Sequence, residues 1–340
     1  MPLQRVERHA ARRPNRLCSG GQVCRALAVA LLLPDIAAAT APPENSTDQP
    51  IWRATHGLLL GLARAGNRIV AVGTRGNILL SDNEGESWKI SKSGTDELLT
   101  GAVFTSGTEG WVIGQDERVL HSENAGDTWT EQHVAATSDQ ALFSIVAFSP
   151  KHLLASGAYN LILETNDGVT WREGKLPDLE DDYHLNCAAA RGDDVLVTGE
   201  AGHAFIRYAG AWTAMKLPYD GSQFACATGK DGSFYSFGLR GRGFRAEPGA
   251  ATWTPLQTGT QQSIFGASVL ADGRMVLVGA TGYVAVYDPA NGNTITLPPQ
   301  TGATLCAALP VAGGEIIVAG DDGLHRMRLP AATATAGNTP

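Results

Sequence analysis

The chain has 340 residues, of which 40 are glycine, and it carries 34 acidic against 26 basic side chains. The acidic balance argues against nucleic acid and anionic membrane surfaces as main partners, because both are negatively charged. The charged fraction is only 18%, and this value together with the abundant glycine suits an all-β repeat protein with many turns.

Residues 1–41 predict a cleaved export signal. Six arginines lead into the apolar run Ala26–Leu33, which is too short to span a bilayer, and small residues around Ala39 and Ala41 fit cleavage sites. An uncleaved anchor is the competing interpretation. Without this segment the chain keeps 20 basic and 32 acidic side chains. We expect a periplasmic or secreted monomer with no inserted membrane segment.

A polar linker, residues 42–50, leads into a repetitive region, 51–330, and residues 331–340 are expected to be a disordered tail. The clearest copy of the repeat is 69–88, IVAVGTRGNILLSDNEGESW. It reads as an apolar strand, a G-x-x-G turn, a second apolar strand, a polar turn and a Trp that opens a third strand. Alternating strands bounded by Gly and Asn turns indicate an antiparallel meander.

Two markers share one period. The Gly that ends the first strand of each copy recurs after 39 to 43 residues, and the Trp recurs after 41 or 42. A period of about 40–45 residues built from strands indicates propeller blades of four strands. We therefore predict an all-β, seven-bladed β-propeller of four-stranded antiparallel blades. The markers are Gly73, Gly114, Gly157, Gly199, Gly238, Gly279 and Gly320, with Trp88, Trp129, Trp171, Trp212 and Trp253.

The third residue after each marker Gly is suited to a tight turn. Five of the seven are Gly and one is Asn, which tolerate positive φ. A phosphate-binding loop is disfavoured, because such a loop opens a helix, whereas an apolar strand follows here. The seven residues are Gly76, Glu117, Asn160, Gly202, Gly241, Gly282 and Gly323.

The ring needs a closing strand, because the seventh copy has no Trp strand of its own. Trp52 lies 36 residues before Trp88, close to one repeat. We predict that the N-terminal strand around Trp52 supplies the outer strand of the last blade. This arrangement would leave no open edge between the first and last blades.

The first three copies share a turn that resembles the Asp box of bacterial neuraminidase repeats. Each has Asn, then Gly two residues later, then Ser or Thr directly before Trp; the Asn residues are Asn83, Asn124 and Asn166. We expect the Asn side chain to accept backbone hydrogen bonds and the Trp to pack between blades. A calcium loop is disfavoured, because there are too few carboxylates.

Taken over residues 51–330, the pattern resembles the photosystem II stability/assembly factor family of BNR-like propellers. The resemblance implies a non-enzymatic assembly factor. Similar proteins of non-photosynthetic bacteria are exported and linked to membrane transporters, and we expect this chain to be one of them. Photosynthetic members carry an arginine-rich patch, whose nearest equivalent here is Arg240, Arg242 and Arg245. These residues are a candidate docking site for an acidic protein patch, with a solvated turn as the alternative.

The predicted function is therefore an exported, non-enzymatic scaffold that binds a protein partner and assists a membrane complex or transporter. No cofactor and no metal site are expected, because the histidines lack ligand spacing and the acidic run 178–182 fits a solvated loop. The alternative is a glycan-binding or sialidase-like propeller. That alternative requires a central pocket with converging arginines and a Tyr–Glu pair.

Three cysteines outside the signal fall on predicted innermost strands. Cys187 and Cys226 precede their marker Gly by 12 residues, and Cys306 precedes Gly320 by 14. Ala follows each of them, as expected where blades converge on the axis. We predict buried free thiols. A Cys187–Cys226 bridge between neighbouring blades is the alternative in an oxidising compartment.

Overall fold

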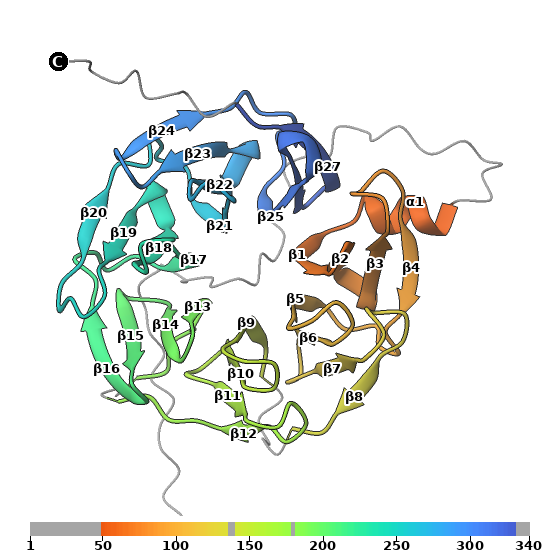
Figure 1. The fold of residues 1–340 in the computed structure, drawn as a ribbon, viewed down its shortest axis with the longest axis horizontal. Coiled ribbons are helices and arrows are strands. Elements are labelled where there is room, and N and C mark those ends of the chain that lie inside the picture. The colour runs from red at the N-terminus through yellow and green to blue at the C-terminus, as the bar shows by residue number, and fades with distance from the viewer. Residues whose placement is uncertain (1–48, 135–139, 178–180, 331–340) are drawn as a thin grey trace, which may run out of the picture. The chain divides into compact units, whose positions relative to one another are not determined.

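The computed structural model describes residues 49–134, 140–177 and 181–330. The predicted signal, residues 42–48 of the linker and the predicted tail lie outside these ranges. The described residues form seven antiparallel sheets around a central axis, six with four strands and one with three (Figure 1). The predicted seven-bladed propeller is confirmed. Within the described ranges, no helix has the length and apolar character needed to cross a bilayer.

The strands follow one another in chain order within each blade. Blades 1 to 4 contain β1 (Leu59–Ala65), β2 (Arg68–Gly73), β3 (Asn77–Ser81), β4 (Lys89–Lys92), β5 (Leu99–Phe104), β6 (Gly110–Gly114), β7 (Val119–Ser122), β8 (Thr130–Gln132), β9 (Leu142–Ala147), β10 (Leu153–Gly157), β11 (Ile162–Thr165), β12 (Arg172–Glu173), β13 (Cys187–Arg191), β14 (Asp194–Thr198), β15 (His203–Tyr208) and β16 (Ala211–Lys216). Blades 5 to 7 contain β17 (Gln223–Thr228), β18 (Phe234–Gly238), β19 (Gly243–Ala246), β20 (Thr254–Leu256), β21 (Ile264–Val269), β22 (Met275–Gly279), β23 (Val284–Asp288), β24 (Asn293–Thr296), β25 (Leu305–Val311), β26 (Glu315–Gly320) and β27 (Gly323–Arg328).

The first strand of each blade lies at the axis and the last at the rim (Figure 1). Second strands such as β6 and β10 are buried along their whole length, because each sheet is covered on both faces by its neighbours. The apolar clusters accordingly span pairs of blades: Val70 and Leu80 of blade 1 pack with Val112 of blade 2.

Each marker residue must be Gly because a backbone carbonyl group passes so close to it that no side chain would fit. Gly73 is extended, with φ of −176°, so its conformation alone does not demand Gly. A Cβ on Gly73 would collide with the carbonyl oxygen of Leu58, directly before the first strand of the same blade. The other six markers meet the equivalent carbonyl. The repeated Gly therefore fixes how the second strand passes the start of the first.

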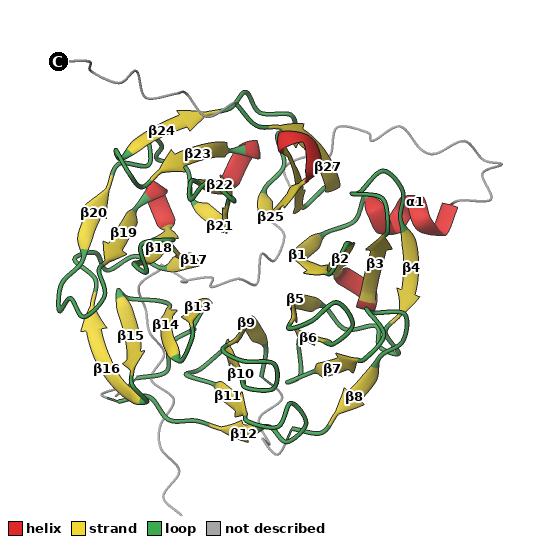
Figure 2. Ribbon diagram, viewed as in Figure 1, coloured by secondary structure: helices red, strands yellow, loops and turns green. Residues whose placement is uncertain are grey.

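The third residue after each marker has positive φ in all seven blades, as predicted. The values run from 52° at Glu117 to 94° at Gly323. At Gly76 a Cβ would also collide with the carbonyl oxygen of Thr95, in the connection to blade 2. These turns include the short 3-10 segments η1 (Thr74–Gly76), η2 (Leu239–Gly241) and η3 (Ala280–Gly282), drawn in red in Figure 2. A further segment, η4 (Ala312–Gly314), joins β25 to β26.

The Asx turn between the third and fourth strands, here called the box turn, forms as predicted in blades 1 and 2. The Asn83 side-chain oxygen accepts hydrogen bonds from the Ser87 backbone N–H and the Ser81 hydroxyl, each at 3.0 Å. In blade 3 the prediction that the Asn166 side chain accepts the hydrogen bonds of the turn is wrong. Asp167 takes that role, because the hydroxyl comes from Thr165, one residue later in the repeat than Ser81 in blade 1.

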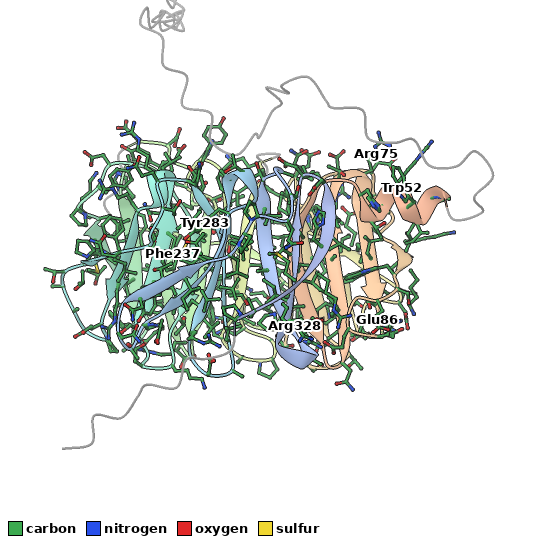
Figure 3. The ribbon with its side chains drawn as sticks, turned by 90° about the horizontal axis from the view of Figure 1, so that it is seen from above. Trp52, Arg75, Glu86, Phe237, Tyr283 and Arg328 are labelled. Atoms are coloured by element: carbon green, nitrogen blue, oxygen red, sulfur yellow. A yellow bond between two sulfur atoms is a disulfide. The ribbon has the colours of Figure 1, made fainter. Side chains whose placement is uncertain are left out.

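The Trp after each of these turns packs against the preceding blade. Trp129 of blade 2 packs with Leu80 of blade 1, and Trp171 of blade 3 with Trp111 of blade 2. Figure 3 shows Arg75, in the turn after a marker Gly, and Glu86, in a box turn, at opposite faces of the ring. We call these faces the turn face (the seven turns that follow the marker Gly residues) and the box face (the box turns around Asn83, Asn124 and Asp167).

The predicted closing strand around Trp52 is wrong. Residues Gln49–Thr55 form the helix α1, and blade 7 has only three strands. Pro50 is tolerated in the first helical turn, while Ile51 and Ala54 pack on Leu324 and other residues at the junction of blades 7 and 1. Trp52 stacks on His56 at 4.7 Å between ring centroids. The segment therefore lies at the predicted junction but as a helix.

Candidate functional site

The three predicted binding arginines lie in two environments. Arg240, in η2, and Arg242, directly after it, are exposed at the turn face. Arg245 lies further along, on β19, where its Nη2 atom donates to the Asp231 carboxylate at 2.6 Å. In the described part of the chain no carboxylate pairs with Arg240 or Arg242. Two of the three guanidinium groups are therefore available to a ligand.

Arg245 belongs to a structural cluster in blade 5. Burial alone would raise the pKa of Asp231, but hydrogen bonds from the Ser233 backbone and hydroxyl and the charge of Arg245 lower it below its ordinary value. The Ser233 hydroxyl also accepts a hydrogen bond from Arg245 at 3.0 Å. These contacts tie β19 to the turn between β17 and β18, so the prediction of Arg245 as a docking residue does not fit its surroundings.

Arg240 and Arg242 border a polar groove, here called the arginine groove, with a volume of about 810 Å³. One wall is the turn after Gly238 and the other is the connection from β20 to blade 6. The lining residues are Arg240, Gly241, Arg242, Gly243, Phe244, Pro255, Leu256, Gln257, Thr258, Gly259, Thr260 and Gln261. The arginine groove is therefore lined both by guanidinium and amide donors and by the apolar side chains that form its floor.

The two walls of the arginine groove are held together by hydrogen bonds. The Thr258 hydroxyl donates to the Gly241 carbonyl at 2.5 Å, and the Tyr283 hydroxyl donates to the Thr258 carbonyl at 2.8 Å. Burial raises the pKa of Tyr283 to about 12, so the phenol stays protonated at neutral pH. A Cβ on Gly241 would collide with the Thr260 carbonyl, which explains the Gly at this turn. The groove is preformed.

The two arginines present different donors. The Arg242 guanidinium carbon lies 5.9 Å from the ring centroid of Tyr219, a cation–π distance that orients its plane. Arg240 has a φ of 55° at the tip of the turn, is exposed, and makes no ion pair within the described ranges. A planar guanidinium pairs well with a carboxylate or with backbone carbonyls. The site can therefore hold an acidic, extended segment.

The axial channel opens on the turn face through a ring of seven residues, one at the start of the innermost strand of each blade. In six of the seven blades the register between the first two strands shifts at this point, as between Leu59 and Gly61. The bulge turns the intervening side chain towards the channel. The ring consists of Leu60, Thr100, Phe143, Asn186, Phe224, Phe265 and Cys306, which all line a cavity of about 270 Å³.

The residues that line this cavity include no Asp, Glu, Lys, Arg, His or Tyr. A sialidase-like site would need converging arginines with a Tyr–Glu pair at the axis. That constellation is absent from the described lining. No group of three or more metal-ligating side chains occurs in the described ranges, and the run 178–182 lies partly outside them.

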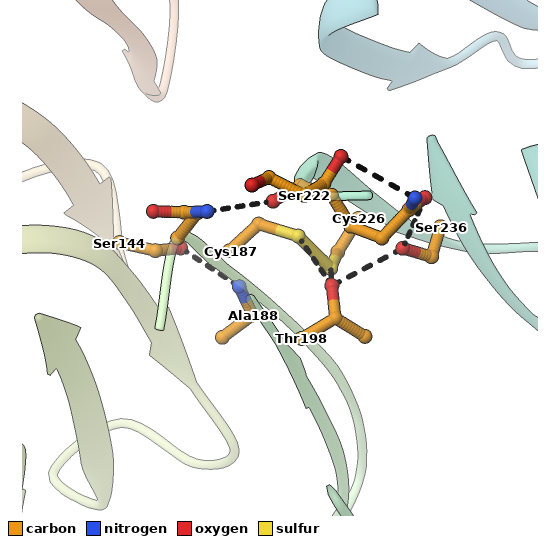
Figure 4. Close-up of a disulfide and its surroundings, with 9 residues drawn as sticks. Ser144, Cys187, Ala188, Thr198, Ser222, Cys226 and Ser236 are labelled. Atoms are coloured by element: carbon orange, nitrogen blue, oxygen red, sulfur yellow. Dashed lines mark hydrogen bonds between the residues drawn. A yellow bond between two sulfur atoms is a disulfide. The ribbon is translucent and has the colours of Figure 1, made fainter. Parts of the chain in front are cut away.

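The prediction of free thiols at Cys187 and Cys226 is wrong: they form a disulfide (Figure 4). The bond joins β13 of blade 4 to β17 of blade 5 beside the channel, with 5.6 Å between the Cα atoms. The Thr198 hydroxyl lies 3.1 Å from the Cys187 sulfur and 3.1 Å from the Ser236 hydroxyl. Cys306 is a free thiol, and burial raises its pKa to about 12.

With this geometry established, comparison with known proteins places the chain. The family model described as "Photosynthesis system II assembly factor YCF48" matches residues 70–137 and 104–297, which together span more than half of the chain. The chain belongs to this family. A rice protein (Oryza sativa subsp. japonica), the chloroplastic photosystem II stability/assembly factor HCF136, is 25% identical over 215 residues. That match covers 61% of this chain and 46% of the rice protein, so the chain spans about half of its relative.

Solved structures share the fold. One described as "YCF48 bound to D1 peptide" has a TM-score of 0.67 at 14% identity, covering 81% of this chain and 93% of its own. YCF48 from Cyanidioschyzon merolae has a TM-score of 0.66 at 16% identity, covering 81% and 96%. A streptogramin B lyase has a TM-score of 0.70 at 12% identity, covering 80% and 93%. At these identities the structures show the propeller alone.

The sequence did not reveal the second wall of the arginine groove or the disulfide. The wall comes from Gln257 to Gln261, in the connection to blade 6, where Thr258-Gly259-Thr260 has an equivalent only in Ser93-Gly94-Thr95 of blade 1 among the described connections.

The disulfide had a signal: Cys187 and Cys226 share an offset of 12 residues from their marker Gly on the innermost strands of neighbouring blades. Their registers differ by one residue, since Cys187 pairs with Thr198 and Cys226 with Ser236. Cys306 has another offset and no Cys on either adjacent blade.

Proposed function

We propose that this propeller is an exported, non-enzymatic binding protein that holds an acidic, extended segment of a protein partner in the arginine groove. By this activity it assists the assembly or operation of a membrane complex or transporter. The observation that carries the proposal is the pair Arg240 and Arg242, which have no carboxylate partner in the described ranges and border a preformed polar groove.

The charge distribution supports this reading. The chain is acidic as a whole, with a formal net charge of −8, so two exposed arginines at one groove form a local exception. Such a patch attracts an acidic segment and orients it, while the acidic remainder of the surface repels other acidic proteins. The relative described as bound to a D1 peptide has the same fold, which supports a peptide-type ligand.

The axial cavity supports binding over turnover. Its lining includes Thr100, Ser144 and Asn186 but no Asp, Glu, Lys, Arg, His or Tyr that would act as a general acid or base. The lyase relatives share only the propeller, so their activity does not transfer by fold. We therefore expect no hydrolysis of a fluorogenic sialoside.

The test is co-purification of the mature protein with its partner from native membranes, read by quantitative mass spectrometry. The double variant Arg240→Ala/Arg242→Ala should lose at least about tenfold of the specifically captured partner, as expected for removal of two charge-assisted contacts. Capture that does not change in the double variant would place the partner elsewhere.

Arg75→Ala is the matched control. Arg75 is also an exposed Arg in the turn after a marker Gly, in blade 1, with φ of 57° against 55° for Arg240. The substitution Arg75→Ala therefore removes a positive charge from the same face of the ring, away from the arginine groove. Capture should stay within about twofold of the wild type, since isolated surface charges contribute little. An equal loss with Arg75→Ala would mean that net charge, and not the groove, determines binding.

A further inference from the structure

Blade 7 has an open edge where the other six blades have a fourth strand. Its sheet order is β25-β26-β27, and β27 pairs only with β26. Helix α1 contacts the start of β27, where Thr55 abuts Gly323. Within the described ranges, no backbone hydrogen bond reaches the outer edge of β27. Unpaired strand edges of this kind accept a further strand.

An apolar groove runs along this edge. It has a volume of about 350 Å³ and lies between blades 6 and 7. Ile295, Leu297 and Pro298 line it from blade 6, and Met327 and Leu329 line it from blade 7. We call it the edge groove. Ile295 is 41% exposed, which is unusual among the large apolar side chains of this protein.

Blade 5 shows what such a groove holds when a fourth strand is present. Trp253, directly before β20, packs among Leu217 of blade 4 and Ala246 of its own blade. Leu217 and Leu297 each directly follow the fourth strand of their blade. Ala246 and Met327 each pair with the residue four before the marker Gly. The edge groove therefore lies where a Trp packs in blade 5.

The other side of the edge is basic. The side chain of Arg328 is 78% exposed and only loosely paired, at 3.6 Å from Glu315. Arg326 is less exposed and already pairs with Glu315 at 2.5 Å and with Glu86 at 3.7 Å, so Arg328 is the freer of the two charges. The strand itself, GLHRMR, contains no carboxylate. An added strand that alternates a bulky apolar side chain with an acidic one would place the first in the edge groove and the second beside the arginines.

We propose that β27 binds an extended peptide of a partner protein as the fourth strand of blade 7, with an aromatic or large aliphatic residue in the edge groove and acidic residues facing Arg326 and Arg328. The chain's own residues 331–340, AATATAGNTP, contain neither kind of side chain. This second surface lies at the rim and does not depend on the arginine groove.

The probe is a synthetic peptide with the sequence of residues 211–217, AWTAMKL, which forms the fourth strand of blade 4. In that strand Trp212 packs towards blade 3 and Met215 towards blade 5. A second peptide carries Thr213→Glu and Met215→Glu, which puts carboxylates on the side that would face the arginines. Titration should show tighter binding of the acidic peptide, and replacing Trp212 by Ala should weaken it about tenfold.

Two protein variants locate the site. Ile295→Lys should weaken binding of the acidic peptide about tenfold, whereas Ile90→Lys, on β4, should leave it within about twofold. The two isoleucines are matched, since both lie on fourth strands and are 41% and 44% exposed. Hydrogen exchange should slow at Leu324 to Arg328 when the peptide is bound.

Three results would overturn the proposal. The full chain could bind no peptide while a version ending at Pro330 does, which would assign the edge to residues 331–340. Light scattering could show a dimer that Ile295→Lys abolishes, which would assign it to a second copy. Failure of both versions to bind any peptide would leave the edge without this role. Arg240→Ala/Arg242→Ala should not affect the titration, so failure here and failure of the proposed function are distinguishable.

Discussion

Blades 1–3 and blades 4–5 reach the same sheet geometry by different means. In blades 1–3 an Asx side chain and a hydroxyl fix the turn before the rim strand, as Asn83 and Ser81 do. Blades 4 and 5 lack this turn and are joined near the axis by the Cys187–Cys226 disulfide. Both halves keep the marker Gly and the positive-φ residue three positions later. The close backbone contact at the marker Gly is thus common to all these blades, whereas the turn before the rim strand differs between them.

The largest expected effect compares one rim Trp from blade 3 with one from blade 4. Trp171 is 1% exposed, and its indole N–H donates to Gln132 at 2.7 Å. Trp171→Ala should lower the free energy of unfolding by about 3–5 kcal/mol, as for other buried aromatic residues. Trp212 of blade 4 is only half-buried, so Trp212→Ala should cost clearly less. Urea denaturation measures both. Equal losses would show that the rim Trp does not distinguish these two blades.

Loss of the disulfide should affect only blades 4 and 5 strongly. The bond closes a loop with a sequence separation of 39 residues. Cys187→Ala/Cys226→Ala should cost about 2–4 kcal/mol of global stability, and partial opening of blades 4 and 5, which the bond holds together, should become easier than opening elsewhere. Hydrogen exchange should accelerate in β13 and β17 more than in β1 to β12. Cys306→Ala is the control with an intact disulfide, and uniform acceleration around the ring would contradict a local role.

A smaller effect tests the box turn itself. Asn83→Ala removes an acceptor from the Ser87 backbone N–H and should cost about 1 kcal/mol, the typical net value of one hydrogen bond. Asn166→Ala in blade 3 should be close to neutral, because Asp167 accepts the equivalent bond. Thermal denaturation of the two variants compares them directly. A loss at Asn166 equal to that at Asn83 would contradict the shifted turn of blade 3.

The smallest effect is the pH dependence of the box turn in blade 3. Hydrogen bonds from the Thr170 and Val169 backbone hold the pKa of Asp167 well below its ordinary value. A lowered folded pKa contributes stability that is complete above the unfolded value, about 3.9, and is lost as pH falls through the folded pKa. The protection factors of the Val169 and Thr170 amides, which correct for the pH dependence of intrinsic exchange, should therefore fall on acidification below that value.

In blade 2 the equivalent acceptor is the amide of Asn124, which does not titrate, so the Thr128 amide is the matched control. The Asn83 turn is unsuitable as a control, because Arg68 and Arg64 also lower the pKa values of its carboxylates Asp82 and Glu84.

The sequence predicted the parts of the fold that repeat. The Gly and Trp periods gave seven blades, and the turn pattern gave positive φ at five Gly residues and Asn160. Glu117 adopts positive φ as well, although its residue type did not indicate it. The prediction failed where a residue has no repeat equivalent. Trp52 lay 36 residues from Trp88 instead of about 41, and its neighbours Ile51 and Ala54 have helical rather than strand spacing.

The site was predicted in part. Arg240 and Arg242 border the arginine groove, but strand alternation turns Arg245 to Asp231. The choice between free thiols and a disulfide depended on whether the sulfur atoms of Cys187 and Cys226 meet between adjacent blades. Equal spacing from the marker Gly could not decide this, because the register shift in β17 pairs Cys226 with the residue two before its marker, whereas Cys187 pairs with the residue one before.

The central claim, that the arginine groove holds the partner, is tested most directly by site-specific photo-crosslinking. A benzophenone amino acid replaces Gln257, exposed at the rim of the groove, or Glu123, exposed in a box turn on the opposite face. Irradiation with native membranes should join a specific protein to the chain substituted at Gln257, and not to that substituted at Glu123. A crosslink from Glu123 alone would contradict the account.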